Sequence, residues 1–186
     1  MSNRIDIGPA RRSDRDELRA MQALSFRVLG APFYDEPVIE TFIADIGTMD
    51  DNLLDDGTYF KATEDGRIVG CGGWSWRTPG YVARMAADPP PGRATGATVR
   101  SVYVHPDCAR RGIARALMSA IEAEMVAAGF GAASLTATLS GIPLYRRLGY
   151  ASGGPVALRL AGERLFVGLA MSKPLARAGS PEALAA

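Results

Sequence analysis

The residues best suited to binding phosphate form one arginine-rich segment, Arg110–Arg115, with a glycine inside it. An apolar stretch, Val99–Val104, and the pair His105-Pro106 precede the segment, and apolar residues four positions apart follow it. This order predicts a strand, a turn and the start of a helix, where backbone N–H groups lack intrahelical partners and the helix dipole is positive. Gly112 has no Cβ, so a ligand can approach the backbone closely. We therefore predict a diphosphate site formed by Arg110, Arg111, Gly112, Ile113, Ala114 and Arg115.

A second segment, Ile142–Tyr150, reads Ile-Pro-Leu-Tyr-Arg-Arg-Leu-Gly-Tyr and places Tyr145 in a short predicted helix. Together the two segments resemble two motifs of the GNAT superfamily of acyl-CoA-dependent N-acetyltransferases. These motifs are the pyrophosphate loop, Gln/Arg-x-x-Gly-x-Gly/Ala, and the segment Leu-Tyr-x-x-x-Gly-Phe/Tyr. Gly112 and Ala114 match the loop motif, whereas its first position is Ala109 here. The side-chain contact of that position is therefore missing, and the neighbouring arginines are candidates to replace it.

The resemblance extends from about residue 4 to about residue 175 and implies one α/β domain of the GNAT fold, residues 1–175, with a mixed central sheet and helices on both faces. We expect residues 176–186 to form a disordered tail. The strands predicted by periodicity and turn residues are Arg4–Ile7, Thr58–Thr63, Arg67–Trp76, Thr98–Val104, Ser134–Leu139, Val156–Leu160 and Leu165–Met171. Helices are predicted after a Ser13–Asp16 capping box, with Leu18, Met21, Leu24 and Val28 on one face, and at Pro37–Ile46, Arg111–Ala128 and Pro143–Leu148.

The same resemblance implies acetyl-CoA as the co-substrate and indicates how it binds. The strands at residues 98–104 and 134–139 are expected to separate, so that the exposed backbone of Val102, Tyr103 and Val104 pairs with the pantetheine amides. Tyr145 is expected to contact the cofactor and to donate a proton to the leaving thiolate, as a phenol with a pKa of ~10 can. A second interpretation of Tyr145, packing with a hydrogen bond to the cofactor sulfur or to the backbone, stays open.

The acceptor site is predicted from aromatic and acidic residues near the open end of that cleft. The segment after the helix break at residues 30–32 is expected to overhang the thioester, so Phe33, Tyr34 and Glu36 are predicted acceptor residues. Trp74 shares a strand face with Trp76 and is a fourth candidate, with core packing as its alternative role. The position of the glutamate base of some family members is occupied by Thr98, and His105 is expected to orient the turn. The candidate bases are Asp35, Glu36 and Glu40.

Composition narrows the class of protein. The chain has 186 residues and a formal net charge of +1, which argues against a general nucleic-acid binder. It contains no apolar run long enough for a membrane span and no signal-peptide core, so we expect a cytoplasmic enzyme. One histidine and two separated cysteines predict neither a metal site nor a disulfide framework.

We therefore predict direct transfer of an acetyl group from acetyl-CoA to a primary amine of a small-molecule acceptor. Two alternatives stay open: acetylation of a protein or peptide amine, and a non-catalytic acyl-CoA sensor that releases no CoA when an acceptor is added. The sequence identifies neither the acceptor nor the acyl-chain preference, and it leaves open whether the chain acts as a homodimer.

Overall fold

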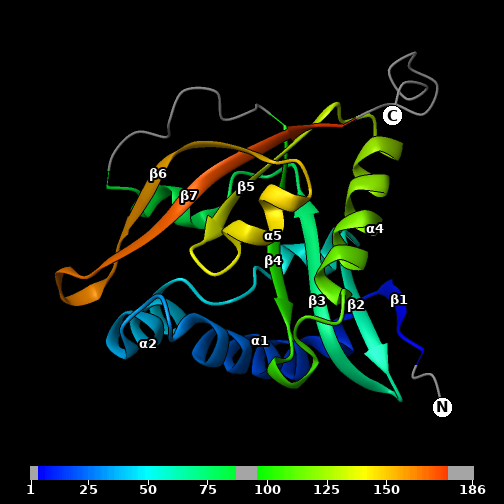
Figure 1. The fold of residues 1–186 in the computed structure, drawn as a ribbon, viewed down its shortest axis with the longest axis horizontal. Helices are drawn as coiled ribbons and strands as arrows, with labels where there is room; N and C mark the ends of the chain where they lie inside the picture. Colours follow the sequence, from blue (N-terminus) through cyan, green and yellow to red (C-terminus); the bar gives the residue numbers. More distant parts are fainter. Residues whose placement is uncertain (1–3, 87–95, 176–186) are drawn as a thin grey trace.

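The computed structural model describes residues 4–86 and 96–175, and Figure 1 shows their arrangement. Within these ranges, seven strands form one sheet in the order β1-β2-β3-β4-β5-β7-β6, in which β4 and β5 are parallel and the other neighbours are antiparallel. The strands are β1 Asp6–Pro9, β2 Tyr59–Glu64, β3 Arg67–Ser75, β4 Ala97–Val104, β5 Ala132–Thr138, β6 Ala151–Arg159 and β7 Leu165–Pro174. The helices are α1 Arg15–Gly30, α2 Glu36–Asp45, α3 Asn52–Asp55, α4 Ile113–Ala127 and α5 Ile142–Arg147, with 3-10 turns η1 Arg12–Asp14, η2 Gly80–Arg84, η3 Pro106–Cys108 and η4 Ala161–Glu163.

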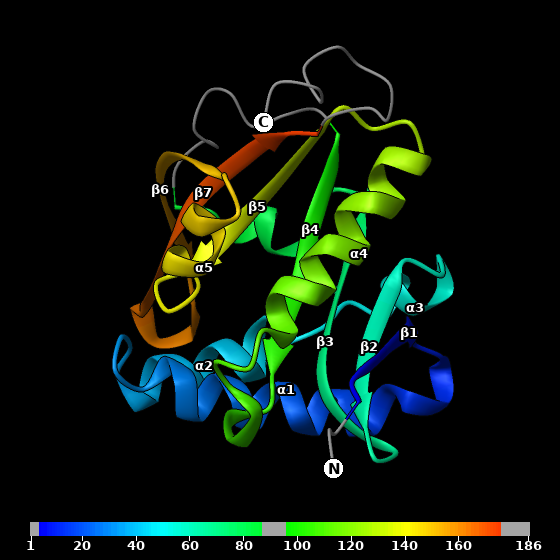
Figure 2. The ribbon, with the colours of Figure 1, turned by 45° about the vertical axis from the view of Figure 1, so that its right-hand side comes forward.

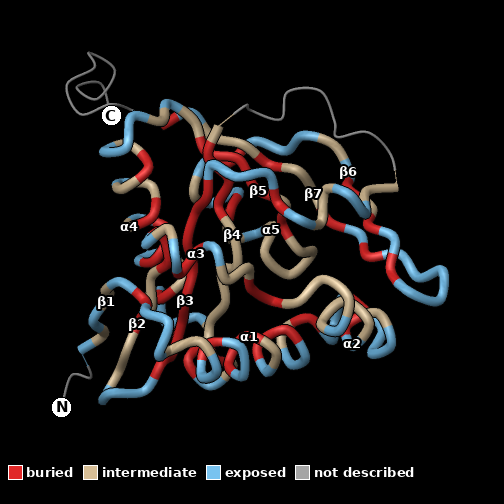
Figure 3. The backbone as a smooth tube through the Cα atoms, turned by 180° about the vertical axis from the view of Figure 1, so that it is seen from behind, coloured by how far each residue is buried: buried red, intermediate tan, exposed pale blue. Residues whose placement is uncertain are grey.

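Helix α4 covers one face of the sheet and α1 the other, which confirms the predicted α/β architecture. Four α4 residues at the predicted spacing are buried: Ile113, Leu117, Ile121 and Met125. Strand β3 turns glycine toward this helix, and a Cβ on Gly70 would lie 2.7 Å from Cγ2 of Ile113, so glycine permits the close approach. On the opposite face, Leu18 and Met21 of α1 pack in a second apolar cluster with residues of β2 and β3. Strand β3 is therefore buried along most of its length, as Figure 3 shows.

The buried face of α1 differs from the prediction. Leu24 and Val28 are 40% and 49% exposed, although the spacing predicted them on the core face. Gln22 points into the core instead. A polar side chain can be buried there because Nε2 of Gln22 donates to the Tyr59 hydroxyl at 2.7 Å and Oε1 accepts from the Thr48 hydroxyl at 2.7 Å. The hydrogen-bond partners of Gln22, as well as the spacing of apolar residues, therefore determine which side of α1 is buried.

The remaining differences concern where elements begin. The predicted Ser13–Asp16 capping box is wrong: Asp14 accepts from the backbone N–H of Arg11 at 2.7 Å, and α1 begins after it. The first strand lies at Asp6–Pro9, two residues later than predicted, and α3 was not predicted at all.

The tail predicted at residues 176–186 lies outside the described residues. None of the described helices combines the length and the apolar character needed to cross a membrane.

Candidate active site

A cavity opens where β4 and β5 separate. These parallel strands pair only through Ala97 with Ala133 and Thr98 with Ser134, near the start of each strand. Beyond these pairs they diverge toward α1 and α2, as Figure 2 shows. The cavity has a volume of about 1150 Å³ and is lined by residues of β4, β5, α5, the segment before α4 and the region from α1 to residue 51. The expected separation of the two strands is confirmed, and it leaves backbone groups of β4 available to an extended ligand.

Strand β4 carries a bulge beside the gap. The pairing register with β3 shifts between Cys71 and Gly73, and Ser101 on β4 has a φ of 53°, in the left-handed region. Such a conformation costs about 1–3 kcal/mol for a residue with a side chain and persists only where its surroundings hold it. The Ser101 carbonyl accepts from the Tyr59 hydroxyl at 2.8 Å on the β2–β3 side. Because C=O and N–H of a trans peptide point in opposite directions, the N–H of Val102 points away from the Tyr59 hydroxyl.

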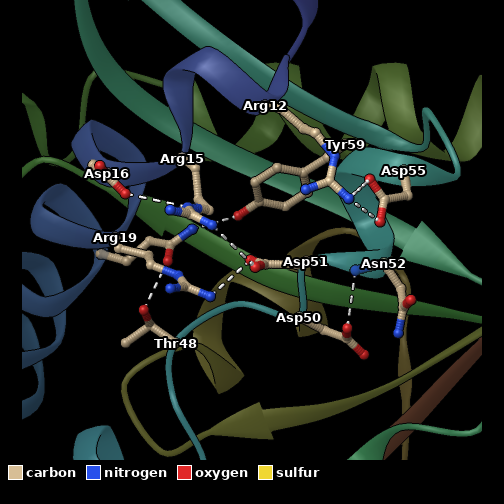
Figure 4. A network of polar contacts seen from close by, with 11 residues as sticks. Arg12, Arg15, Asp16, Arg19, Thr48, Asp50, Asp51, Asn52, Asp55 and Tyr59 are labelled. Atoms are coloured by element: carbon tan, nitrogen blue, oxygen red, sulfur yellow. Dashed lines mark hydrogen bonds and ion pairs between the residues drawn. The ribbon is translucent and has the colours of Figure 1, made fainter.

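A buried polar network of Tyr59, Gln22 and Thr48 holds this bulge in place. Tyr59 is fully buried, and burial raises the pKa of its hydroxyl, which therefore stays a neutral donor. Gln22 links Tyr59 to Thr48, and Thr48 itself lies on the cavity wall. Figure 4 shows Tyr59 and Thr48 in this network, beside the charged residues of α1 and of residues 50–55. The network ties the conformation of β4 to the wall of the cavity.

The arginine-rich segment before α4 forms a concave turn of backbone. Arg110 has a φ of 66° and Gly112 a φ of 84°, and α4 begins at the next residue. Left-handed residues in such a turn direct backbone N–H groups toward one point, which favours an anion. A Cβ built on Gly112 would meet no atom within 4 Å, so the space over the turn is open. The segment's residues that line the cavity are Cys108, Ala109, Arg110, Gly112, Ile113, Ala114 and Arg115.

The guanidinium of Arg111 is directed toward Glu64. Its Nη1 donates to Oε2 of Glu64 at 2.9 Å, and its other terminal nitrogen pairs with the second oxygen of the same carboxylate. Arg111 is not among the residues that line the cavity. In this structure Arg111 fastens the turn to the end of β2, and its predicted bond to a phosphate stays a prediction.

Tyr145 of α5 lies on the cavity wall, opposite β4 across the gap. It is 8% exposed, and its ring stands edge-on to that of Tyr150 with 5.7 Å between centroids. Burial raises the pKa of the Tyr145 hydroxyl well above its usual value near 10, because the phenolate would lose its hydration. The side chain is therefore a neutral phenol, able to donate a proton inside the cavity. Val102, Tyr103 and Val104 line the same cavity.

Of the four predicted acceptor residues, Phe33 alone lines the cavity. The Tyr34 hydroxyl donates to the Val167 carbonyl at 2.8 Å and accepts from the N–H of Leu139 at 2.7 Å, so this residue joins β5 to β7. Burial raises the pKa of Tyr34 to about 12. Glu36 is exposed and lies outside the cavity lining. Trp74 is buried against α4, where its Nε1 donates to Oε2 of Glu124 at 2.6 Å.

The cavity wall carries charged pairs that the sequence analysis missed. Three arginine–aspartate pairs lie on its wall: Arg19 with Asp51 at 2.7 Å, Arg84 with Asp45 at 3.4 Å and Arg100 with Asp50 at 3.0 Å. The available signal was Arg100 itself, because a charged residue inside an otherwise apolar central strand requires a partner. Its partner lies in the segment between α2 and α3, for which the sequence pattern predicted no position.

The other titratable candidates have structural partners. Nδ1 of His105 accepts from the backbone N–H of Asp107 at 3.2 Å, and its Nε2 contacts the Arg67 guanidinium, which fits the expected role in orienting the turn. Glu40 accepts from Arg27 at 2.6 and 2.8 Å on the outer surface, which holds the pKa of Glu40 below its usual value. Neither His105 nor Glu40 lines the cavity.

Comparison with solved structures identifies relatives of this fold. A GCN5-related N-acetyltransferase from Rhodopseudomonas palustris shares 21% identity over 94% of this chain and 99% of its own, with a TM-score of 0.73. The PaiA N-acetyltransferase from Thermoplasma acidophilum, solved with coenzyme A, shares 17% identity over 92% and 99%, with a TM-score of 0.65. The ribosomal-protein-S18-alanine N-acetyltransferase from Escherichia coli shares 18% identity over 96% and 98%, with a TM-score of 0.59.

A comparison with curated proteins gave no match. The family model described as the acetyltransferase (GNAT) family matches residues 16–150, which include the parting strands, the turn before α4 and all of α5. Since this match covers most of the chain, the chain belongs to the acetyltransferase (GNAT) family and is an acetyl-CoA-dependent N-acetyltransferase.

Proposed function

We propose that this enzyme transfers the acetyl group of acetyl-CoA directly to a primary amine of a small molecule, with residues 1–175 as its catalytic domain. The observation that carries the proposal is one cavity that joins the turn at Gly112, the free edge of β4 and the phenol of Tyr145. In this arrangement the diphosphate binds the backbone amides of the turn, with Arg110 and Arg115 as side-chain donors. Pantetheine follows Val102–Val104 as an added strand.

In the proposed reaction, Val102 on one side of the gap stabilises negative charge and Tyr145 on the other side donates a proton. The amine must be neutral to attack, so the ammonium first loses a proton. Its nitrogen then forms a bond to the thioester carbonyl carbon, and the N–H of Val102 stabilises the negative charge that develops on the carbonyl oxygen. The C–S bond breaks, the thiolate takes the proton of Tyr145, and the excess proton on the nitrogen passes through water to the Tyr145 oxygen, which restores the phenol.

The aromatic residues of the cavity wall favour a small molecule over a protein segment. They are Phe26, Phe33, Phe42, Tyr81 and Phe166. An aromatic wall selects an acceptor by shape and helps to exclude water from the reacting atoms. A protein acceptor would instead need an extended surface channel for several residues.

The proposal is tested by following free thiol in the presence of acetyl-CoA and a panel of acceptors. Small primary amines are expected to release CoA, whereas peptides with free amino termini or lysines are expected to react far more slowly. Faster reaction with peptides would favour the protein-acetylating alternative. An acetyl-CoA-induced rise in melting temperature without any acceptor-dependent thiol release would indicate a non-catalytic sensor.

Phe33→Ala is expected to raise KM for the amine about 3- to 10-fold, because it removes an aromatic contact worth roughly 1 kcal/mol from the acceptor wall. KM for acetyl-CoA should stay unchanged. Glu36→Gln is the matched control from the same segment, and we expect no change in either constant because Glu36 lies outside the cavity lining. Steady-state kinetics with both substrates check this prediction. A rise in KM for acetyl-CoA alone would move the acceptor site away from Phe33.

Tyr59→Phe is expected to lower kcat about 2- to 10-fold without changing either KM, because the Ser101 carbonyl loses a hydrogen bond worth about 0.5–1.5 kcal/mol. The same change should destabilise the fold by about 1–3 kcal/mol, since Gln22 also loses its hydrogen bond to the Tyr59 hydroxyl. Thermal unfolding and kinetics on one preparation separate the two effects. A normal kcat in a destabilised variant would show that the bulge holds its conformation without Tyr59.

A further inference from the structure

Arg100 is the most deeply buried of the three arginines that pair with aspartates on the cavity wall. Its side chain is 9% exposed, whereas those of Arg19 and Arg84 are 47% and 44% exposed. It projects from β4 immediately before the bulge at Ser101, and it lines the cavity. Its guanidinium places a positive charge on the cavity wall.

The guanidinium of Arg100 has five N–H donors, and only some of them have a partner. Nη2 of Arg100 donates to Oδ2 of Asp50 at 3.0 Å. Nη1 is buried and has no hydrogen-bond partner within the part of the chain that the structure describes. A buried donor without an acceptor is rare in folded proteins and is more costly on a charged group. Because Arg100 lines the cavity, a small rotation of its side chain would turn this nitrogen toward a ligand atom that accepts a hydrogen bond.

The carboxylates nearby are already engaged. Oδ1 of Asp50 accepts from the backbone N–H of Asn52 at 3.0 Å, and its Oδ2 accepts from Arg100. Asp51 accepts from Arg19 at 2.7 Å, and Figure 4 shows this pair beside Asp50. A ligand ammonium group would share these carboxylates with their present donors, while a ligand oxygen finds a charged donor that has no other acceptor. Arg100 is therefore suited to bind an anionic oxygen.

We propose that Arg100, oriented by Asp50, binds a carboxylate of the acceptor, so that the substrate is a small amino acid rather than a simple amine. The inference rests on the proposed function and names its substrate class. Arg100 and Val102 are two residues apart on one strand, at most about 7 Å along its axis. The carboxylate and the amine that attacks the thioester beside Val102 therefore belong to one small molecule. A charge-assisted bond to a buried guanidinium gives the selectivity that the aromatic wall lacks.

The test compares acceptors that differ by one carboxylate. α-Amino acids are paired with their decarboxylated amines, and ω-amino acids with the alkylamines of equal length. In the pair that reacts fastest, wild-type enzyme is expected to show a kcat/KM for the acid at least roughly tenfold higher than for the matching amine. Arg100→Gln is expected to raise KM for that acid about 10- to 100-fold, as loss of a hydrogen bond to a charged group does.

Two further variants separate binding from folding. Arg100→Lys keeps a positive charge beside Asp50 and should fold normally, yet it lacks the second donor nitrogen and should lose most of the preference for the acid. Arg84→Gln is the matched control, because it also breaks an arginine–aspartate pair on the cavity wall, but one whose arginine is exposed. Its preference should equal that of wild type.

A binding measurement keeps this inference separate from the proposed function. In the presence of CoA, the preferred acid should raise the melting temperature of wild type and not that of Arg100→Gln, whether or not thiol is released. Absence of thiol release with that shift intact would contradict the proposed catalysis alone. Equal kcat/KM within every pair, no shift with any acid, or equal shifts in wild type and Arg100→Gln would overturn the inference.

Discussion

Replacement of Tyr145 by phenylalanine is expected to lower kcat about 10²- to 10⁴-fold, the usual contribution of a general acid. The phenylalanine ring keeps the volume of Tyr145 and its edge-on contact with Tyr150, so α5 should keep its position. The substitution removes only the hydroxyl group, and without this group the thiolate leaves unprotonated. KM for acetyl-CoA and the acetyl-CoA-induced rise in melting temperature should change little.

The pH dependence follows from burial. The pKa of Tyr145 is raised, so its hydroxyl stays protonated at the pH where an ordinary tyrosine ionises. It loses its proton only at a higher pH. Between about pH 6 and about pH 9 the wild-type rate should therefore rise with pH, because the acceptor ammonium, with a pKa of ~10.4, becomes more deprotonated. Tyr145→Phe should give a parallel profile at a lower level. A kcat within about threefold of wild type would show that Tyr145 only packs and hydrogen-bonds the cofactor.

The elements that the sequence predicted well are those whose pattern is local. In α4, apolar residues at every fourth position indicated the buried stripe, and the helix forms as expected. The turn at Gly112 was predicted for the same reason, since a strand, a proline and a glycine follow one another within a few residues. The separation of β4 from β5 came from the family resemblance, because apolar residues on β4 fit a fully paired strand equally well.

The acceptor side was predicted poorly because it depends on contacts between distant segments. Tyr34 looked like an exposed aromatic after a helix break, yet its hydroxyl bridges Leu139 and Val167. Trp74 was placed on the correct strand, but its face packs against α4 and not the cavity. The charged residue Arg100 on β4 signals that it needs a partner, but only the structure shows that this partner is Asp50, fifty residues earlier. The sequence carries no local signal for which distant residue completes such a pair.

Gly112→Asp is expected to weaken acetyl-CoA binding about 10²- to 10³-fold. The new carboxylate would project into the open space over the turn, where the diphosphate is proposed to bind. Two like charges about 4 Å apart at a protein surface repel by about 4 kcal/mol, which corresponds to this loss. At a concentration of acetyl-CoA that stabilises wild type, the variant should show no rise in melting temperature.

Two variants separate charge from backbone strain. Gly112→Asn has nearly the same shape and the same left-handed φ of 84°, but no charge, so it should lose only about tenfold in affinity. Gly129→Asp places a carboxylate at another open left-handed glycine, with a φ of 89°, beyond the opposite end of α4, and should bind acetyl-CoA normally. If Gly112→Asp keeps the full rise in melting temperature, the diphosphate does not bind at this turn. If Asn weakens binding as much as Asp, the effect comes from shape rather than charge, and the anion lies farther from the backbone than proposed.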